Sequence, residues 1–264
     1  MNLIVPLFVL YYRWGFATHG CVDGFSRVIV FLRCCTANTA EQVATSFIAA
    51  CNKYGLPHRV RSDHGLENFN VGILMNILRG QNRGSIITGK SVHNQRIERL
   101  WRDVFKEVVS TFYSEFYAME DAGILVADDP LHRCALQLSY LPSINARLGT
   151  FQNAWNNHSV RTEGHCTPEQ LWLSGTLEHA NTSHTDEILC EGTPSVHQRI
   201  IQYCSQYVDV NAVAGASDYA NGWHGDDITL SQFQLDELNN VLSTATSDHA
   251  RYETCLLKLR ELLS

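Results

Sequence analysis

The sequence predicts an α/β fold with a mixed sheet, because short β-type segments and an amphipathic helix alternate near its start. Residues 17–32 contain two runs rich in β-branched and aromatic side chains around the turn signal at residues 23–26, and so predict a hairpin. Residues 39–54 carry apolar side chains at helical spacing, and the segment 55–57, with its glycine and proline, ends that helix. Residues 59–63 then predict a short strand that ends in an acid. The order β, β, α, β is typical of an α/β domain.

Further helices are predicted along the rest of the chain. From the apolar spacing, they are expected over residues 71–78, about 94–117 and much of 120–175, with two short helices within 230–263. The apolar pattern weakens after about residue 176. We therefore expect a core over residues 1–175, followed by a mainly helical extension over residues 176–264.

Charge is divided unevenly between these two parts. Residues 1–175 hold 16 basic and 14 acidic side chains, a net +2, whereas residues 176–264 hold 4 and 13, a net −9. Within the first part, residues 59–106 hold 9 basic and 4 acidic side chains, a local +5. A basic centre beside an acidic tail is compatible with phosphate binding. The charge step also leads us to expect that the extension folds separately from the core, or only loosely against it.

Neither the cysteines nor the apolar segments point to a secreted or membrane-spanning protein. The nine cysteines are odd in number and scattered, as expected for reduced thiols in a cytosolic or nuclear protein. The longest apolar run, residues 3–12, is short beside the roughly 20 residues that span a bilayer. We therefore expect a nuclear or cytoplasmic protein that is not secreted and does not bind a membrane.

Two carboxylates stand at positions where functional groups collect in such a fold. Asp63 ends the strand predicted over residues 59–63, and ligands of open α/β sheets bind at the carboxyl ends of strands. Glu98 lies on the helix predicted over residues 94–117, at the border between an apolar and a basic stripe. The apolar stripe consists of Ile97, Leu100, Trp101, Val104 and Val108, and the basic stripe of Arg99, Arg102 and Lys106. At that border Glu98 can reach a metal ion while the basic stripe faces phosphates; the alternative is a solvent-exposed helix with an ordinary Glu98–Arg102 ion pair.

Four segments, in the same order along the chain, resemble the integrase core of retroviral-type integrases and DDE transposases. Residues 22–27 resemble the hairpin that follows the first strand of those cores. Asp63 and Glu98, with their neighbours and their spacing, resemble the second and third catalytic acids. Residues 155–172 resemble the closing helical segment, so that the resemblance covers roughly residues 11–175.

The resemblance implies a ribonuclease H-like sheet whose three acids hold two Mg²⁺ or Mn²⁺ ions and cut or join DNA by in-line phosphoryl transfer. On this chain it implies Asp63 and Glu98 as catalytic and metal-binding residues. The residues that it implies for DNA contact are basic and share one helix: Arg96, Arg99, Arg102 and Lys106. It also implies a homo-oligomer that binds DNA. Residues 92–103 in particular resemble animal integrase-core proteins derived from mobile elements.

The chain departs from the family at the first acid. Residues 1–22 contain no Asp or Glu, and the family position falls near Pro6. Proline suits a central strand badly, because it cannot donate to the strand ladder. Either the acid lies upstream of Met1, or the chain descends from a decayed or repurposed element, with its first strand truncated or replaced.

The missing acid leads us to expect weak, salt-sensitive DNA binding with impaired metal-dependent chemistry. Two alternatives stay open. One is an active two-metal nuclease or integrase in which Asp23 or Glu67 supplies the third ligand, although the ordinary role of Asp23 is turn chemistry. The other is a non-catalytic protein-interaction module that uses the acidic extension.

Overall fold

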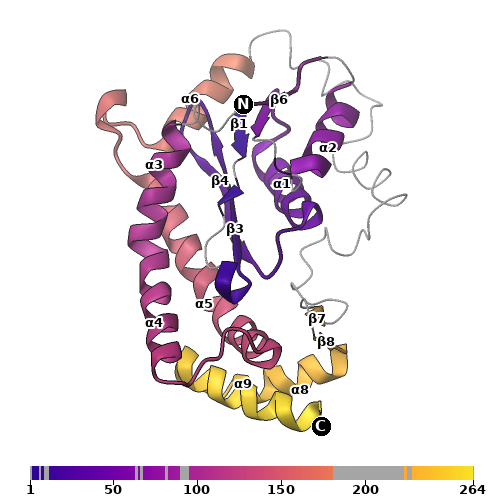
Figure 1. Cartoon of the computed structure of the whole chain (residues 1–264). Coiled ribbons are helices and arrows are strands. Elements are labelled where there is room, and N and C mark those ends of the chain that lie inside the picture. Colours follow the sequence, from indigo (N-terminus) through magenta and orange to yellow (C-terminus); the bar gives the residue numbers. More distant parts are fainter. Residues whose placement is uncertain are drawn as a thin grey trace.

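The centre of the protein is a six-stranded sheet with helices on both faces (Figure 1). The structure is a computed structural model that describes residues 2–5, 7–8, 12–62, 65, 68–80, 83–89, 95–180, 223–224 and 228–263. The strands of the sheet are β1 (Asn2–Val5), β2 (Leu7–Phe8), β3 (Ala17–Asp23), β4 (Ile29–Cys35), β5 (Arg59–Ser62) and β6 (Ile86–Thr88). The predicted mixed sheet flanked by helices is confirmed, with the hairpin formed by β3 and β4.

The sheet is antiparallel in one half and parallel in the other. β3 pairs antiparallel with β4 on one side and with both β1 and β2 on the other. β1 pairs parallel with β5, and β5 pairs parallel with β6. The first strand of the fold is therefore made of two short pieces, β1 and β2, in the middle of the sheet.

Every helix predicted from the apolar spacing is present. The helices and helical turns are η1 (Tyr12–Trp14), α1 (Ala40–Tyr54), α2 (Phe69–Arg79), α3 (Gln95–Val104), η4 (Phe105–Val109), α4 (Ser110–Asp121), α5 (Pro130–Asn157), η5 (Arg161–Glu163), α6 (Pro168–Ala180), α8 (Gln232–Leu242) and α9 (Asp248–Leu262). Two short strands, β7 (Trp223–His224) and β8 (Thr229–Leu230), pair with each other. The elements α3, η4 and α4 follow one another without a break and form one long rod at the side of the molecule (Figure 1).

Capping side chains set where several of these helices begin. The side chain of Thr39 caps α1, and that of Asp129 caps α5 directly before Pro130. Ser231 and Gln234 form a capping box at the start of α8. The side chains of Thr39, Asp129 and Ser231 accept from backbone amides of the first turn, which have no partner within the helix. The side chain of Gln234 accepts in return from the backbone amide of Ser231.

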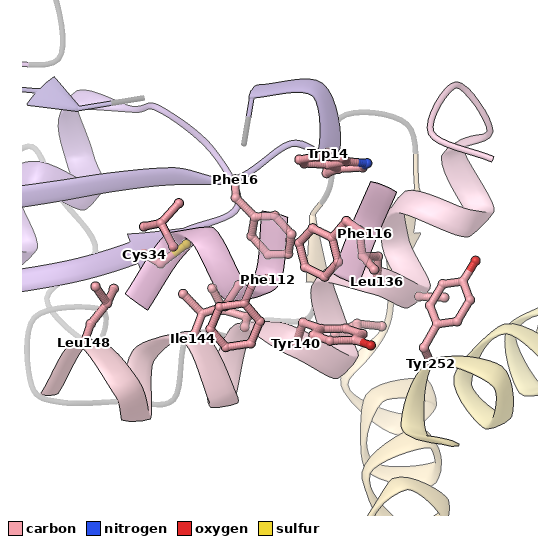
Figure 2. Packing of buried hydrophobic residues seen from close by; sticks show 14 of the residues in the cluster. Trp14, Phe16, Cys34, Phe112, Phe116, Leu136, Tyr140, Ile144, Leu148 and Tyr252 are labelled. Atoms are coloured by element: carbon pink, nitrogen blue, oxygen red, sulfur yellow. The ribbon is translucent and has the colours of Figure 1, made fainter. Parts of the chain in front are cut away.

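Each face of the sheet has its own hydrophobic core. On one face α1 and α2 pack against the strands, and Phe47 and Met75 are fully buried there. On the other face the core is formed by α3, α4 and α5 and is rich in aromatic rings (Figure 2). The ring of Phe116 lies 5.2 Å from that of Trp14 and 4.9 Å from that of Tyr140, measured between centroids. Edge-to-face contacts of this kind add to the stabilisation from burial alone.

The C-terminal helices belong to this second core, so the expectation of a loosely attached extension is wrong for residues 228–263. Tyr252 of α9 is fully buried, and its hydroxyl lies 2.6 Å from Nδ1 of His132 in α5 and 3.0 Å from the carbonyl oxygen of Ile124. Leu238 of α8 is buried in the same cluster. The expectation rested on net charge, which exposed side chains carry. How firmly a segment is attached depends instead on its buried apolar side chains. The boundary between core and extension stays a prediction.

One edge of the sheet is closed by amide side chains of α5. Asn145 accepts from the amide of Cys34 at 2.8 Å and donates to its carbonyl at 3.0 Å. Asn156 makes the same pair of bonds with Ile29, at 2.8 and 3.0 Å, and Gln152 donates to the carbonyl of Ile29 at 2.9 Å. These amides take the place of a neighbouring strand along β4 and hold α5 against it.

Two further observations bear on the setting of the protein. The cysteines that the structure describes are free thiols: Cys21, Cys34, Cys35, Cys51, Cys134, Cys166 and Cys255. Among the described helices, none combines the length and the apolar character that crossing a membrane requires.

Candidate nucleic-acid interface and catalytic site

The long helix turns its apolar stripe to the sheet and its basic stripe to solvent, as predicted. The apolar stripe is at most 4% exposed at Leu100, Trp101, Val104 and Val108. Arg99 and Arg102 are exposed, and the side chain of Lys106 is 80% exposed. We call these three residues the basic flank. The side chains of Ile97 and Arg96 lie outside the described part of the chain.

The contact that seats α3 on the sheet is made by Gly20 and Trp101. A Cβ atom on Gly20 would lie 2.8 Å from Cη2 of Trp101, so the indole occupies the space that a side chain would need. β1 pairs with β3 as far as Val22, and β2 pairs with it in the same register from His19 onward. Gly20 lies between those two pairings. Helix α3 therefore crosses the sheet beside the break between β1 and β2.

Glu98 lies one helical turn before Trp101 and is exposed. Residues three apart are neighbours on a helix surface, so Glu98 is held close to the point where α3 crosses the sheet. Its carboxylate makes no hydrogen bond or ion pair with another residue that the structure describes, and the alternative ion pair with Arg102 is not formed. The Glu98 carboxylate is thus open to solvent and available to a ligand.

The described ends of β1 and β5 lie side by side. They are parallel neighbours, and their last pair joins Val5 to Ser62. In the sequence, Val5 immediately precedes Pro6 and Ser62 immediately precedes Asp63. Pro6, Asp63 and Glu67 lie outside the described residues. The expected approach of the two candidate catalytic acids to within about 4–8 Å therefore stays a prediction.

Asp23 is engaged in its own hairpin, away from this end of β1. Its Oδ2 accepts from the backbone amide of Ser26 at 2.9 Å and from the hydroxyl of Ser26 at 2.8 Å, and Asp23 is 2% exposed. It pairs with Leu3, whereas Ser62 pairs with Val5, about 7 Å further along β1. The turn role of Asp23 is thus confirmed. The geometry argues against the alternative in which Asp23 supplies a third metal ligand.

The described residues do not fit the pair of metal ions that the resemblance implies. Two ions need several carboxylate ligands between them, and no group of three His, Cys, Asp or Glu within the described ranges could hold even one ion. The segment Asn2–Val5 contributes no acid from β1, and Asp23 is committed to its turn. Of the candidate ligands, Glu98 is the one that the described part of the chain presents.

A buried histidine on β3 lies beside the break between β1 and β2. His19 is 1% exposed and pairs with Leu7. Burial lowers the pKa of His19 from 6.5 to about 4, and a hydrogen bond with the backbone of Ala37 opposes this shift only in part. His19 is therefore neutral near pH 7 and adds no charge to the site.

The turn that joins α3 to α4 was not predicted from the sequence. The turn η4 is π-helical and leaves both Val108 and Val109 buried. Phe105, Tyr113 and Tyr117 follow along this helix and are exposed. The spacing of these three aromatic residues was the sequence feature from which the π-helical turn could have been predicted. Phe105 and Tyr113 are eight residues apart, one more than the seven that bring two side chains of an α-helix to the same face.

The model of a family described as "Integrase core domain" matches residues 9–186. Matching solved structures include the catalytic core domain of HTLV-2 integrase in complex with magnesium, in dimeric and trimeric forms. They are 16% and 15% identical to this chain, cover 64% of it and 94% of their own chain, and have TM-scores of 0.38 and 0.36. No curated protein sequence matches. Because the family match spans well over half of the sequence, this chain belongs to the integrase core domain family.

Proposed function

We propose that this chain is a nucleic-acid-binding integrase-core protein of mobile-element origin whose strand-cutting and strand-joining chemistry is impaired. The observation that carries the proposal is the exposed basic flank of α3 and η4 beside the solvent-open carboxylate of Glu98. The resemblance assigns DNA contact to this helix, through Arg96 and the basic flank, and catalysis to Asp63 and Glu98.

The basic flank is suited to phosphate contact. Arg99 and Arg102 are exposed and make no ion pair with a described carboxylate. Lys106 lies 3.4 Å from Glu107, but both side chains are well exposed, and such surface pairs are weak in water. Cations of this kind bind phosphates by displacing counterions, a contribution that needs neither a metal ion nor a base sequence.

The proposed loss of catalysis follows from the small number of carboxylates that could bind the two metal ions. The first strand has no acid, and the nearest acid in the sequence, Asp23, is held in its hairpin by Ser26. Asp63 and Glu98 alone would leave one ion short of an anionic ligand, and Mg²⁺ dehydrates reluctantly. Stabilising both the attacking and the leaving oxygen requires both ions. We therefore propose that DNA binding is retained while cleavage and strand transfer are lost.

The binding half is tested by fluorescence anisotropy with a labelled DNA duplex at salt concentrations from about 50 to about 200 mM. We expect weak binding that falls steeply with salt. Removing one cation in Arg99→Ala, Arg102→Ala or Lys106→Ala should reduce the salt slope by about 1. Lys53→Ala, an exposed cation on α1, is the matched control and should leave the slope unchanged. Binding that ignores both salt and these substitutions would favour the protein-interaction module instead.

The catalytic half is tested by incubating the chain with labelled DNA and Mg²⁺ or Mn²⁺. We expect neither cleavage nor strand transfer. The positive control is Pro6→Asp in a variant whose first strand is rebuilt to resemble that of the family. We expect cleavage from this variant. Cleavage by the unmodified chain that disappears in Asp63→Asn would overturn the proposed impairment. Glu67→Gln would then test whether Glu67 supplies the third ligand.

The family resemblance also leads us to propose self-association and a nuclear location. Analytical ultracentrifugation of the full chain tests the first, and a monomer at every concentration would contradict it. Microscopy of a tagged chain tests the second, with a cytoplasmic location as the alternative outcome.

A further inference from the structure

Three exposed aromatic rings lie along the rod formed by α3, η4 and α4, and we call them the aromatic row. They are Phe105, Tyr113 and Tyr117, which are 40%, 37% and 38% exposed. The rings of Phe105 and Tyr113 lie 6.2 Å apart, and those of Tyr113 and Tyr117 lie 4.8 Å apart. Neighbouring aromatic rings that stay exposed are a feature of interaction surfaces.

The π-helical turn brings these rings into line. In an α-helix, Phe105 and Tyr113 would lie about 80° apart around the axis, because eight residues exceed two turns by that amount. A π-helical turn takes up one extra residue, which removes most of this offset. The ring contacts, from Phe105 to Tyr113 and from Tyr113 to Tyr117, follow from this smaller offset.

The aromatic row starts on the same side of the helix as Glu98. Phe105 is seven residues after Glu98, which places the two within about 20° of each other around the axis. Arg102 and Lys106, three before and one after Phe105, are exposed beside the row. From Glu98 to Tyr117 the helix rises about 28 Å, at about 1.5 Å per residue.

The aromatic row is supported from behind by a fixed ring. The centroid of the buried Trp14 lies 5.3 Å from that of Tyr113 and 5.1 Å from that of Tyr117. Trp14 Nε1 donates to Glu120 at 2.6 Å, and Arg13 pairs with the same carboxylate at 2.8 Å. The two tyrosines are therefore held in place before any ligand arrives, which reduces the entropy cost of binding.

We propose that the aromatic row binds a single, unpaired nucleic-acid strand that runs from Glu98 along α4, with bases stacked on the rings and phosphates beside Arg102 and Lys106. This inference rests on the proposed function and adds the kind of nucleic acid to it. Aromatic rings that stack on bases, with cations beside them for the phosphates, are how proteins bind single strands without reading their sequence. Here the cations Arg102 and Lys106 lie beside Phe105, at the start of the row, and α4 itself contains no Lys or Arg. The rings of Phe105, Tyr113 and Tyr117 lie 6.2 and 4.8 Å apart, a row that accommodates about three stacked bases at the 3.4 Å spacing of one duplex strand.

A base-paired duplex does not fit the row equally well. The faces of paired bases are stacked on one another, and a ring can reach them only after the pairs open, which costs a few kcal/mol. A protein partner would also suit exposed aromatic rings, but exposed cations beside the row favour a phosphate-bearing strand. A second copy of the chain or another protein on the row is therefore an outcome that the test must detect.

The test compares a fluorescein-labelled oligo(dT) of about 20 nucleotides with a duplex of the same length, each titrated with the full chain. We expect Phe105→Ala and Tyr117→Ala to weaken binding of the single strand by about five-fold or more, since stacking on one ring contributes this much or more. Duplex binding through the basic flank should change little. Tyr117→Phe keeps the ring and should retain single-strand binding. Phe233→Ala removes an exposed phenyl ring of α8, 76% exposed, and is the matched control.

A second readout does not depend on affinity. In an oligo(dT) that contains 5-iododeoxyuridine, light should crosslink the bases to a peptide that contains Phe105, Tyr113 or Tyr117, identified by mass spectrometry. Duplex binding without this crosslink, and with single-strand binding unaffected by the aromatic variants, would overturn the inference but leave the proposed function standing. Absence of binding to both probes would overturn both. A change of oligomeric state in Phe105→Ala, with unchanged oligo(dT) binding, would assign the row to a protein contact and also overturn the inference.

Discussion

Trp101 of α3 fills the space above Gly20 of β3, the residue that lies between the pairings of β1 and of β2. Glycine allows this approach because it has no Cβ atom. The contact sets the position of α3 along the sheet. It therefore also sets the position of Glu98, which lies one helical turn before Trp101. The position of the candidate catalytic carboxylate thus depends on a residue of β3 with no side chain.

The first prediction concerns Gly20→Ala. The new methyl group would lie 2.8 Å from Trp101 and 3.2 Å from Leu32, so α3 must move or the indole must turn. We expect a loss of about 1–3 kcal/mol in the free energy of unfolding, measured with urea. Gly72→Ala in α2 is the control, since nothing lies within 4 Å of its Cβ position, and it should be neutral or slightly stabilising. Equal stability of the two variants would show that the Trp101 contact is not tight.

The second prediction concerns Tyr252→Phe. The change removes the hydroxyl that lies 2.6 Å from His132 and 3.0 Å from the carbonyl of Ile124, and leaves buried polar atoms without that partner. We expect the free energy of unfolding to fall by about 1–3 kcal/mol. Because α9 packs on α5, unfolding should remain a single transition when followed by fluorescence and by circular dichroism. Separate transitions for the two probes would show that residues 228–263 unfold independently.

The third prediction is a pH dependence due to His19. Its folded pKa of about 4 is below the ordinary 6.5, so the unfolded chain binds more protons between these values. Stability is therefore full above about pH 6.5 and falls as the pH decreases toward 4. The shift corresponds to an upper limit of about 3 kcal/mol. His19→Asn should flatten the urea-unfolding profile over this window. His132, whose pKa is also lowered by burial, acts in the same direction and is present in both proteins.

A fourth prediction concerns the carboxylate behind the aromatic row. The hydrogen bond from Arg13, and then that from Trp14, hold the pKa of Glu120 below its ordinary 4.5. Ionised Glu120 therefore stabilises the fold above about pH 4.5, and this contribution is lost as the pH falls through the lowered pKa. Glu120→Gln should be less stable than the unmodified chain near pH 6, and the difference should shrink below pH 4. A difference that is constant with pH would mean that the charge of Glu120 does not contribute.

Local patterns were enough to predict much of this fold. The hairpin, α1, β5 and the two stripes of α3 follow from the alternation of apolar residues and from the glycine and proline that end α1. The pattern failed where pairing is decided by distant residues. β6 has only three residues and depends on its parallel pairing with β5. Proline is unfavourable in a central strand, and the sequence has a proline at position 6, between β1 and β2. Even so, β1 and β2 pair with β3 in one continuous register.

The candidate site was predicted from the sequence only as a set of residue types. The exposure of Glu98 and the basic flank followed from helical periodicity, because one stripe of the helix had to face the core. The contact of Gly20 with Trp101 joins residues 81 positions apart, and no local signal relates them. The aromatic row depends on a π-helical turn, which a search for α-helical spacing passes over.

The amide side chains of α5 along β4 have a consequence for the solubility of this protein. A sheet edge with unpaired backbone groups is a template on which a strand of another molecule can add. Asn145 and Asn156 already bind the edge groups of Cys34 and Ile29, so an incoming strand would have to displace them. Helix α5 thus shields the β4 edge of the sheet from edge-to-edge pairing. Replacing both asparagines by leucine would reopen the edge and expose newly made chains to fibre-like assembly, even if the native fold were still reached.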